Sequence, residues 1–325
     1  MSTLTAILKE RNRLEGCQFT VCVVGSRKIR PDDDLGTQGW SVLGSNLTIL
    51  GFDADPEATA AANLDLEARQ VSWQESHYDL ALGRQTGEAK LYVTRSVDCS
   101  SLYLPNEQLS QRLQGFSQSL NVDLVIDIPV ISLDDFCEQE GVDQIDFLYL
   151  DIQGAELDVL QGGSQALEKI LGIEAEVEFS PLYQNQPLFA DVDTYLRNQG
   201  FSLFDLSTDH PWSRAPRACS PLRTRKRPGQ LLWADALYLR DLCQQNLPQN
   251  ADPLAILKLA CIADILGCLD YALELLRHLT LTHGAAPRFN VADDVLYLLN
   301  TYPDLVAHGL DTLPLVQDLQ PFLKD

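Results

Sequence analysis

The amino-acid sequence predicts an α/β fold with a mostly parallel β-sheet, followed by a C-terminal region that is entirely helical. The first observation is that short apolar runs alternate with helix-like stretches from residue 19 to about 180, which is typical of a parallel sheet. The second is that the last two apolar runs, residues 201–206 and 230–239, are joined without an obvious helix. We therefore expect them to pair antiparallel at one edge of the sheet. The third is that leucine and alanine recur at helical spacing from about residue 250.

The expected strands are short apolar runs that end at turn residues or carboxylates. Gly25 follows the first run, and Asp53 and Asp151 close two others. The segments expected to be extended are FTVCVV (19–24), NLTILGF (46–52), two strands within LALGRQTGEAKLYVT (80–94), LVIDIPVISL (124–133), DFLYLD (146–151), GIEAEVEF (172–179), FSLFDL (201–206) and QLLWADALYL (230–239).

Helices are expected between several of these strands. Residues 55–68 are alanine-rich and have Asp55 as N-cap. Shorter helices are predicted over residues 133–141 and 191–200, each with a glycine at its C-terminal end. The helix expected after Asp151 has one apolar face, formed by Leu157, Leu160, Leu167 and Leu171.

The change of pattern near residue 250 divides the chain into two expected units. Residues 1–245 form the α/β domain, and residues 246–325 form the helical C-terminal region, which several prolines interrupt. The second unit is interpreted as a packing appendage or as the surface through which the chain forms a homo-oligomer.

Composition excludes several functional classes. Apolar residues make up 45% of the 325-residue chain, enough for a sizeable core. The formal net charge of −22 argues against non-specific binding to nucleic acid or to an anionic membrane, because both need a basic surface. No apolar run is long enough for a signal peptide or a membrane span. The eight cysteines form no Cys-x-x-Cys pair, so we expect reduced thiols in a cytoplasmic protein and no metal site.

The segment DFLYLDIQGAE places polar residues directly after a buried strand. Ligands in parallel α/β sheets bind beyond the carboxyl ends of the strands, so Asp151 is expected to face a ligand crevice. Gly154 would allow a tight turn, and Glu156 falls in the first turn of the next helix. An alternative is that Asp151 and Glu156 only cap this helix.

Gly25 and Asp53 form a second constellation. A glycine after the first strand permits close approach by a ligand, and an acidic residue after the second can accept hydrogen bonds from both ribose hydroxyls, as in nucleotide sites. An ordinary turn glycine and an exposed aspartate are the alternative. There is no Gly-x-Gly-x-x-Gly motif, which weighs against a nicotinamide- or flavin-dependent oxidoreductase.

Together, DFLYLDIQGAELDVLQGG and the following IEAEVEFSPLYQNQPLFADVDTYLRNQGFSLFDL resemble the core of the FkbM family of S-adenosylmethionine-dependent methyltransferases. The resemblance covers roughly residues 18–240 and is most specific between 132 and 206. It implies a class I methyltransferase-like, mostly parallel seven-stranded sheet with an antiparallel edge strand. It also implies S-adenosyl-L-methionine as cofactor and methylation of a hydroxyl on a sugar, a glycan or a related secondary product.

The resemblance also implies site residues. Gly25 and Ser26 would lie against the methionine moiety of the cofactor, Asp53 would bind its ribose, and Asp151, Gln153 and Glu156 would form a loop beside the transferred methyl. Glu176 or Glu178 would face the same crevice. The acceptor, a small molecule or carbohydrate, would be contacted by Tyr183 and Gln186.

Two positions depart from the family pattern. Val23 and Ile29 stand where family members usually have an aspartate and a glycine. The missing carboxylate would accept from the cofactor's ammonium group, and Asp32 to Asp34 are candidates to replace it. A second hypothesis is therefore a non-catalytic methyltransferase-like protein that binds a partner through its helical C-terminus.

Methyl transfer to a hydroxyl is an in-line displacement assisted by a general base. The candidate catalytic residues are Asp151, Glu156 and Glu178, with His210 as an outside candidate for the base. Nothing in the spacing of the carboxylates demands a metal.

Residues 207–229 form a segment that is basic within an acidic chain. We expect this loop, through residues such as Arg223 and Arg225, to attract an anionic acceptor to the crevice mouth. The alternative is a solvated connection.

Overall fold

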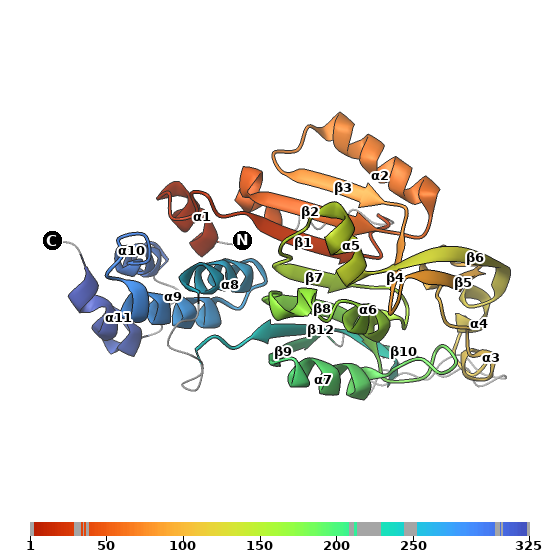
Figure 1. Ribbon diagram of the computed structural model, residues 1–325. Helices are drawn as coiled ribbons and strands as arrows, with labels where there is room; N and C mark the ends of the chain where they lie inside the picture. Colours follow the sequence, from red (N-terminus) through yellow and green to blue (C-terminus); the bar gives the residue numbers. More distant parts are fainter. Residues whose placement is uncertain are drawn as a thin grey trace.

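Seven strands form the central sheet of the computed structural model (Figure 1), in the order β3-β2-β1-β7-β8-β12-β9. The structure describes residues 3–28, 34, 36, 39–207, 211–212, 229–243, 252–302, 306 and 308–323. The strands are β1 (Phe19–Val24), β2 (Leu47–Phe52), β3 (Gln74–Tyr78), β7 (Phe147–Leu150), β8 (Gly172–Glu178), β9 (Phe201–Ser207) and β12 (Trp233–Arg240). Neighbouring strands are parallel except at β12, which runs antiparallel to both β8 and β9.

The predicted fold class, with an antiparallel pair at one end of the sheet, is confirmed. The antiparallel strand β12 is inserted between β8 and β9, so that β9 is the edge strand. The predicted strand over 230–239 is divided, because Gln230–Leu231 form a separate strand, β11, that pairs with β10 (Pro211–Trp212). The sequence analysis did not predict β3, whose polar sequence QESHY lacks an apolar run.

A second, three-stranded sheet contains β4 (Ala81–Gly83), β5 (Gly87–Thr94) and β6 (Val122–Ser132), in the order β4-β6-β5. The two strands expected within residues 80–94 are therefore present. Each of them pairs with β6, in parallel for β4 and antiparallel for β5.

Both faces of the central sheet are buried, because side chains alternate along each strand. Cys22 and Val24 belong to a core shared with α5 (Leu133–Glu140), α6 (Glu156–Gly162) and α7 (Phe189–Asn198). Val21 and Val23 belong to a second core. The helices that contribute to this second core are α1 (Thr3–Glu10), α8 (Pro253–Ile265), α9 (Leu269–His283), α10 (Ala292–Thr301) and α11 (Pro314–Leu319).

The helix capping predicted from the sequence is confirmed at two helices. Asp55 accepts from the backbone N–H groups of Glu57 and Ala58 at the start of α2 (Pro56–Arg69). At the C-terminal end of α5, Gly141 adopts the left-handed conformation that favours glycine.

The helix expected after Asp151 is shorter than its leucine pattern predicts. It ends at Gly162, and a separate 3₁₀ turn, η5 (Ala166–Glu168), follows. A Cβ at Gly162 would overlap the carbonyl oxygen of Gly83 in β4, so only glycine fits at this end of the helix.

The C-terminal helices pack with the N-terminal helix against the amino-terminal side of the sheet (Figure 1). The Lys258 ammonium of α8 lies 2.9 and 3.0 Å from the two carboxylate oxygens of Asp146, directly before β7, and both residues are buried. Asp146 also accepts from the N–H of Thr20 at 2.9 Å. A boundary near residue 245 and a homo-oligomer through these helices stay predictions.

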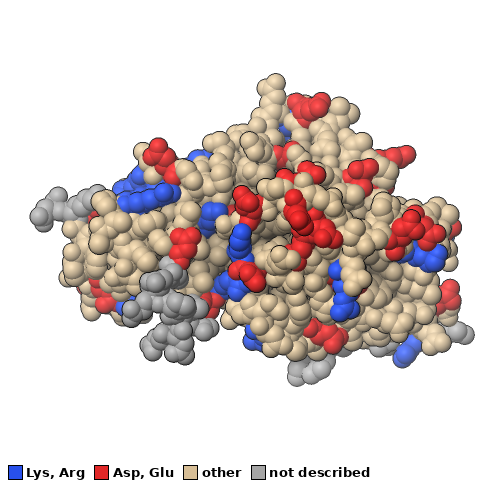
Figure 2. Space-filling model, in the orientation of Figure 1, with Lys and Arg blue, Asp and Glu red and all other residues tan. Residues whose placement is uncertain are grey.

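Acidic and basic side chains are interspersed over the face of the molecule in Figure 2. Within the described part of the chain, no helix is long and apolar enough to cross a membrane. The seven described cysteines are free thiols.

Replacing Lys258 by Met should lower the free energy of unfolding by about 3 kcal/mol, because the Asp146 carboxylate then stays buried without its counter-charge. Urea denaturation followed by circular dichroism measures the change. Lys90→Met is the matched control, since Lys90 and Asp127 form an exposed ion pair and its loss should leave the midpoint unchanged. Equal midpoints for the two variants would contradict the prediction.

Candidate functional site

The carboxyl ends of β1 and β7 meet at one rim of the sheet, where Gly25 lies against Asp151. Gly25 has a φ of +85°, and a Cβ there would overlap the carbonyl oxygen of Asp151. The N–H of Asp151 donates to the carbonyl of Val24 at 3.0 Å, and the N–H of Gly25 donates to Phe52 at 2.9 Å. Glycine is therefore required at position 25 by the protein's own backbone. As predicted, Asp151 comes at the carboxyl end of a parallel strand.

Gln153 joins the carboxylates at this rim. Its amide nitrogen donates to Asp151 at 2.8 Å and to Glu176 at 2.7 Å. The hydroxyl of Tyr183 lies 3.1 Å from Gln153 Oε1, and that of Ser101 donates to the Gln153 carbonyl at 2.7 Å. Gln153 has a φ of +59°, which is uncommon for a residue other than glycine. These contacts on three sides hold it in that conformation, and such strain occurs preferentially at functional sites.

Glu156 closes the turn that begins at Asp151. Its buried carboxylate accepts from the N–H of Ile152 at 2.9 Å and from that of Gly154 at 3.2 Å. The carboxylate thus bridges the turn before α6 and does not cap the helix, whose N-cap, Ala155, makes no side-chain hydrogen bond. Burial raises the pKa of Glu156 to about 7, and the neighbouring charge of Asp151 acts in the same direction.

Glu178 carries an unsatisfied oxygen at the end of β8. The residue is 3% exposed, and its Oε1 has no hydrogen-bond partner among the described residues. The side chain of Gln186 forms a hydrogen bond with the Glu178 carboxyl group. Its Oε1 also accepts from the N–H of Tyr183 at 2.5 Å. A buried acceptor without a donor is costly. A ligand hydroxyl or N–H would satisfy it.

Four carboxylates therefore gather at one rim: Asp151, Glu156, Glu176 and Glu178. Burial raises the pKa of Glu176 and of Glu178 well above the ordinary range, and mutual repulsion adds to the effect. Such a site favours protons or a cationic ligand. Among the described residues, no group of three or more potential ligands is arranged to hold a metal ion.

The residues predicted at the ends of β1 and β2 lie in a connected polar segment. Ser26 is buried, and its Oγ lies 2.9 Å from Nδ1 of His77. Asp53 accepts from the N–H of Asp55 at 2.8 Å, and burial raises its pKa. Arg27, the residue after Ser26, forms an ion pair with Asp55.

The sequence analysis missed His77 and Glu75, because β3 carries no apolar pattern and no motif. Asp34, one of the proposed substitutes for the missing carboxylate, forms an ion pair with Arg69. Five candidate site residues named in the sequence analysis lie outside the described part of the chain: Asp32, Asp33, His210, Arg223 and Arg225.

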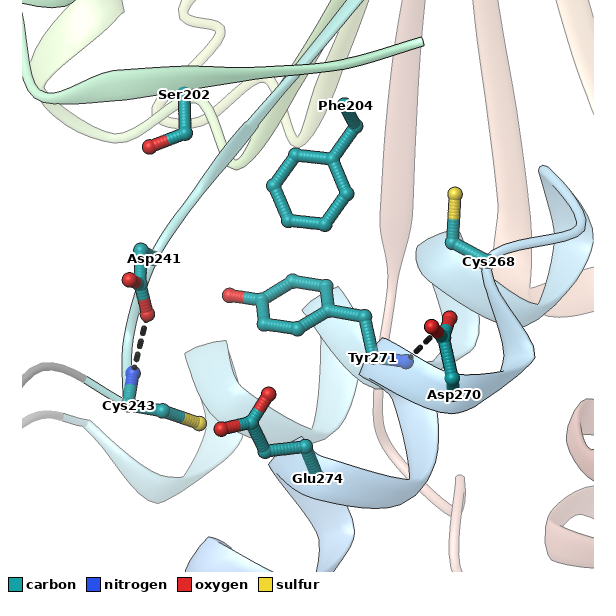
Figure 3. Close-up of a pocket in the computed structure, with 8 residues that line it drawn as sticks. All are labelled: Ser202, Phe204, Asp241, Cys243, Cys268, Asp270, Tyr271 and Glu274. Atoms are coloured by element: carbon teal, nitrogen blue, oxygen red, sulfur yellow. Dashed lines mark hydrogen bonds between the residues drawn. The ribbon is translucent and has the colours of Figure 1, made fainter.

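A separate cavity of about 490 Å³ opens at the opposite end of the sheet (Figure 3). Ser202 and Phe204 come from the start of β9, and Asp241 and Cys243 follow the end of the antiparallel strand β12. Tyr271 of α9 faces them. The cavity is therefore remote from the four-carboxylate rim.

The strand order, with one antiparallel strand inserted beside the edge, and the polar rim at the strands' carboxyl ends define a class I methyltransferase-like fold. The family described as Methyltransferase FkbM domain matches residues 39–203. The chain belongs to this family.

Among curated proteins, the chain is 31% identical over 151 residues to the 2-O-methyltransferase NoeI of Sinorhizobium fredii (strain NBRC 101917 / NGR234). The match covers 44% of this chain and 58% of NoeI. The chain therefore spans little more than half the length of that relative.

Two solved structures resemble this chain at low sequence identity. Methyltransferase FkbM from Methylobacillus flagellatus KT is 15% identical with a TM-score of 0.37, over 69% of this chain and 43% of that one. TehB from Haemophilus influenzae is 9% identical with a TM-score of 0.33, over 72% of this chain and 61% of that one.

Glu156→Gln should stabilise the protein at about pH 8 and have little effect at about pH 5. Glutamine keeps an oxygen that can accept from Ile152 and Gly154. The pKa of Glu156 in the folded protein, about 7, lies above the usual 4.5. Protonated Glu156 therefore contributes stability that is fully present below about 4.5 and is lost as the pH rises through about 7.

Thermal unfolding of the wild type and of this variant at both pH values measures the effect. Exposed Glu88→Gln is the control and should change neither melting temperature. A variant less stable than the wild type at the higher pH would show that the charged form of Glu156 is favoured in the fold.

Proposed function

We propose that this protein is an S-adenosylmethionine-dependent O-methyltransferase that acts on a hydroxyl of a sugar, a glycan or a related secondary product. Membership of the FkbM methyltransferase family supports methyl transfer, and similarity to a protein named 2-O-methyltransferase supports a hydroxyl acceptor. The observation that carries the proposal is the buried, unsatisfied oxygen of Glu178 within the four-carboxylate rim.

The residues at the rim fit this cofactor, which supplies an electrophilic methyl group on a positively charged sulfur when bound. Asp53, after β2, would accept hydrogen bonds from the ribose hydroxyls, and Gly25 and Ser26 would border the methionine end. Asp151 would attract the sulfonium and ammonium charges, and a bound cation would favour the ionised form of Glu176, whose pKa is raised in the free protein. Burial makes that attraction stronger than it would be in water.

Glu178 is the residue best placed to take the proton from the acceptor hydroxyl. Its free oxygen would accept that hydroxyl's hydrogen bond, and Tyr183 and Gln186 would orient the acceptor beside it. The raised pKa keeps Glu178 protonated until a positive charge enters the crevice, because a neighbouring cation favours the ionised form. Asp151 is the second candidate for the base, while Glu156 would act through the turn that it closes.

A non-catalytic, partner-binding protein is the alternative function, and one observation favours it. The Arg27–Asp55 ion pair lies next to Asp53, where the ribose would bind. A ligand that uses Asp53 would have to fit beside this pair or displace it. The pair is partly exposed, so displacement would cost at most about 1 kcal/mol.

Isothermal titration calorimetry with S-adenosylmethionine and S-adenosylhomocysteine tests cofactor binding. The wild type should bind both, and Asp53→Asn should weaken both about tenfold, because the amide accepts fewer hydrogen bonds from the ribose. Asp143→Asn, an exposed change before the amino end of β7, is the control and should bind as the wild type does. Absence of heat with the wild type would favour the non-catalytic alternative.

Glu178→Gln should lower kcat about 100-fold, because the general base is lost, and should leave the Kd for S-adenosylhomocysteine within about threefold. The assay is transfer of radiolabelled methyl from S-adenosylmethionine to a panel of mono- and oligosaccharides. Glu174→Gln, four positions earlier on the same face of β8, is the matched control. Equal kcat for the two variants would exclude Glu178 as the base.

A further inference from the structure

A buried chain of hydrogen bonds connects Ser26, at the end of β1, to two side chains of β3 that no motif marks. Ser26 Oγ lies 2.9 Å from His77 Nδ1, and His77 Nε2 lies 2.9 Å from Glu75 Oε1. Ser26 is 6% exposed, and the side chains of His77 and Glu75 are each 2% exposed. Gly51 of the intervening strand leaves the room for this contact, since a Cβ there would overlap the imidazole ring. We call Ser26, His77 and Glu75 the strand-end relay.

The direction of the hydrogen bonds in the relay follows from the charge of Glu75. Its carboxylate also accepts from Trp73 Nε1 at 2.6 Å and from Lys28 Nζ at 2.9 Å. Burial alone would raise the pKa of Glu75, but the hydrogen bonds from His77, Trp73 and Lys28 outweigh it and lower the pKa to about 2. An ionised Glu75 needs a proton on Nε2 of His77. In the neutral ring, Nδ1 is then an acceptor, so the Ser26 hydroxyl donates to it.

The main chain of His77 is held as firmly as its ring. The side-chain amide of Asn63 in α2 donates to the His77 carbonyl at 2.9 Å and accepts from its N–H at 2.9 Å. His77 is therefore a fixed point to which the end of β1 is attached.

The relay fixes the segment that follows Gly25. Ser26 and Lys28 are both bonded to β3 side chains, and Arg27 between them is paired with Asp55 at the start of α2. This arrangement directs Arg27 toward Asp53 and leaves the backbone of Gly25 at the rim. The N–H groups of Gly25 and Ser26 both donate to the Phe52 carbonyl at 2.9 Å. They are thus not available as an oxyanion hole, which argues against Ser26 as a nucleophile for acyl transfer.

We propose that His77 and Glu75 are positioning residues of the cofactor pocket, and that they hold the Gly25–Lys28 turn in the shape that binds S-adenosylmethionine. This inference rests on the proposed function. Neither residue touches the reacting atoms. Each acts through Ser26 or Lys28 on the turn that borders the methionine end and the ribose.

The test is calorimetric binding of S-adenosylhomocysteine to the full-length chain. Ser26→Ala and His77→Ala should each raise Kd about tenfold, and the double variant should be no more than about twofold weaker than either, because both changes break one relay. His77→Asn should recover most of the affinity, since its side-chain oxygen can take the place of Nδ1. With a competent acceptor, His77→Ala should raise KM for the cofactor and leave kcat within about threefold.

Thr5→Val is the matched control for a purely structural effect. The buried Thr5 hydroxyl of α1 donates to Asp264 of α8 at 2.8 Å. Its loss should lower the melting temperature and leave Kd unchanged. If His77→Ala and Ser26→Ala bind as tightly as the wild type and only melt earlier, the relay is structural and this inference is overturned. If the wild type binds neither S-adenosylmethionine nor S-adenosylhomocysteine, both the proposed function and this inference are wrong.

Discussion

The four-carboxylate rim depends on the contact between the backbones of Gly25 and Asp151. Strands β1 and β7 are neighbours at the centre of the sheet, and they end so close together that position 25 has no room for a Cβ. On one side of this contact β1 has β2 and then β3 as its neighbours, and on the other side β7 has β8 as its neighbour. The four-carboxylate rim lies where β1 and β7 end, which is the position at which ligands generally bind in parallel α/β sheets. Any side chain at position 25 would push the two strand ends apart and change the shape of this rim.

The rim is crowded with negative charge, and Gln153 is the residue that makes the crowding tolerable. Its amide donates to two carboxylates at once, while its backbone is held at a φ of +59°. A neutral amide that donates to Asp151 and Glu176 satisfies both carboxyl groups without adding a counter-charge, and the repulsion between them is one cause of the raised pKa of Glu176. The remaining repulsion is relieved when a cation binds. A sulfonium cofactor would gain from this, and its uncharged thioether product would gain less, which favours release after transfer.

The sequence predicted the elements that have a strong local signal. The apolar runs predicted every strand of the central sheet except β3, and Asp55 and Gly141 marked helix ends by their own chemistry. It could not predict β3 or the relay, because the partners of His77 come from segments distant in the chain. It also did not predict that α6 ends at Gly162, where β4 lies so close that only glycine fits. The family motifs indicated the rim residues. Only the structure shows that the Glu156 carboxylate binds the N–H groups of Ile152 and Gly154 in the turn that precedes α6.

An aspartate lies directly before strand β7 and another directly after it. The first has a basic partner, and the second has acidic neighbours. Asp146, before the strand, is neutralised by Lys258 and bound by Thr20 N–H, which ties the C-terminal helices to the sheet. Asp151, after the strand, is held by the neutral amide of Gln153 beside Glu176. The same residue type is thus balanced by a counter-charge at the amino end and left with acidic neighbours at the carboxyl end. Negative potential at the rim can therefore be retained for a ligand, because the ion pair that stabilises the fold lies at the other end of the strand.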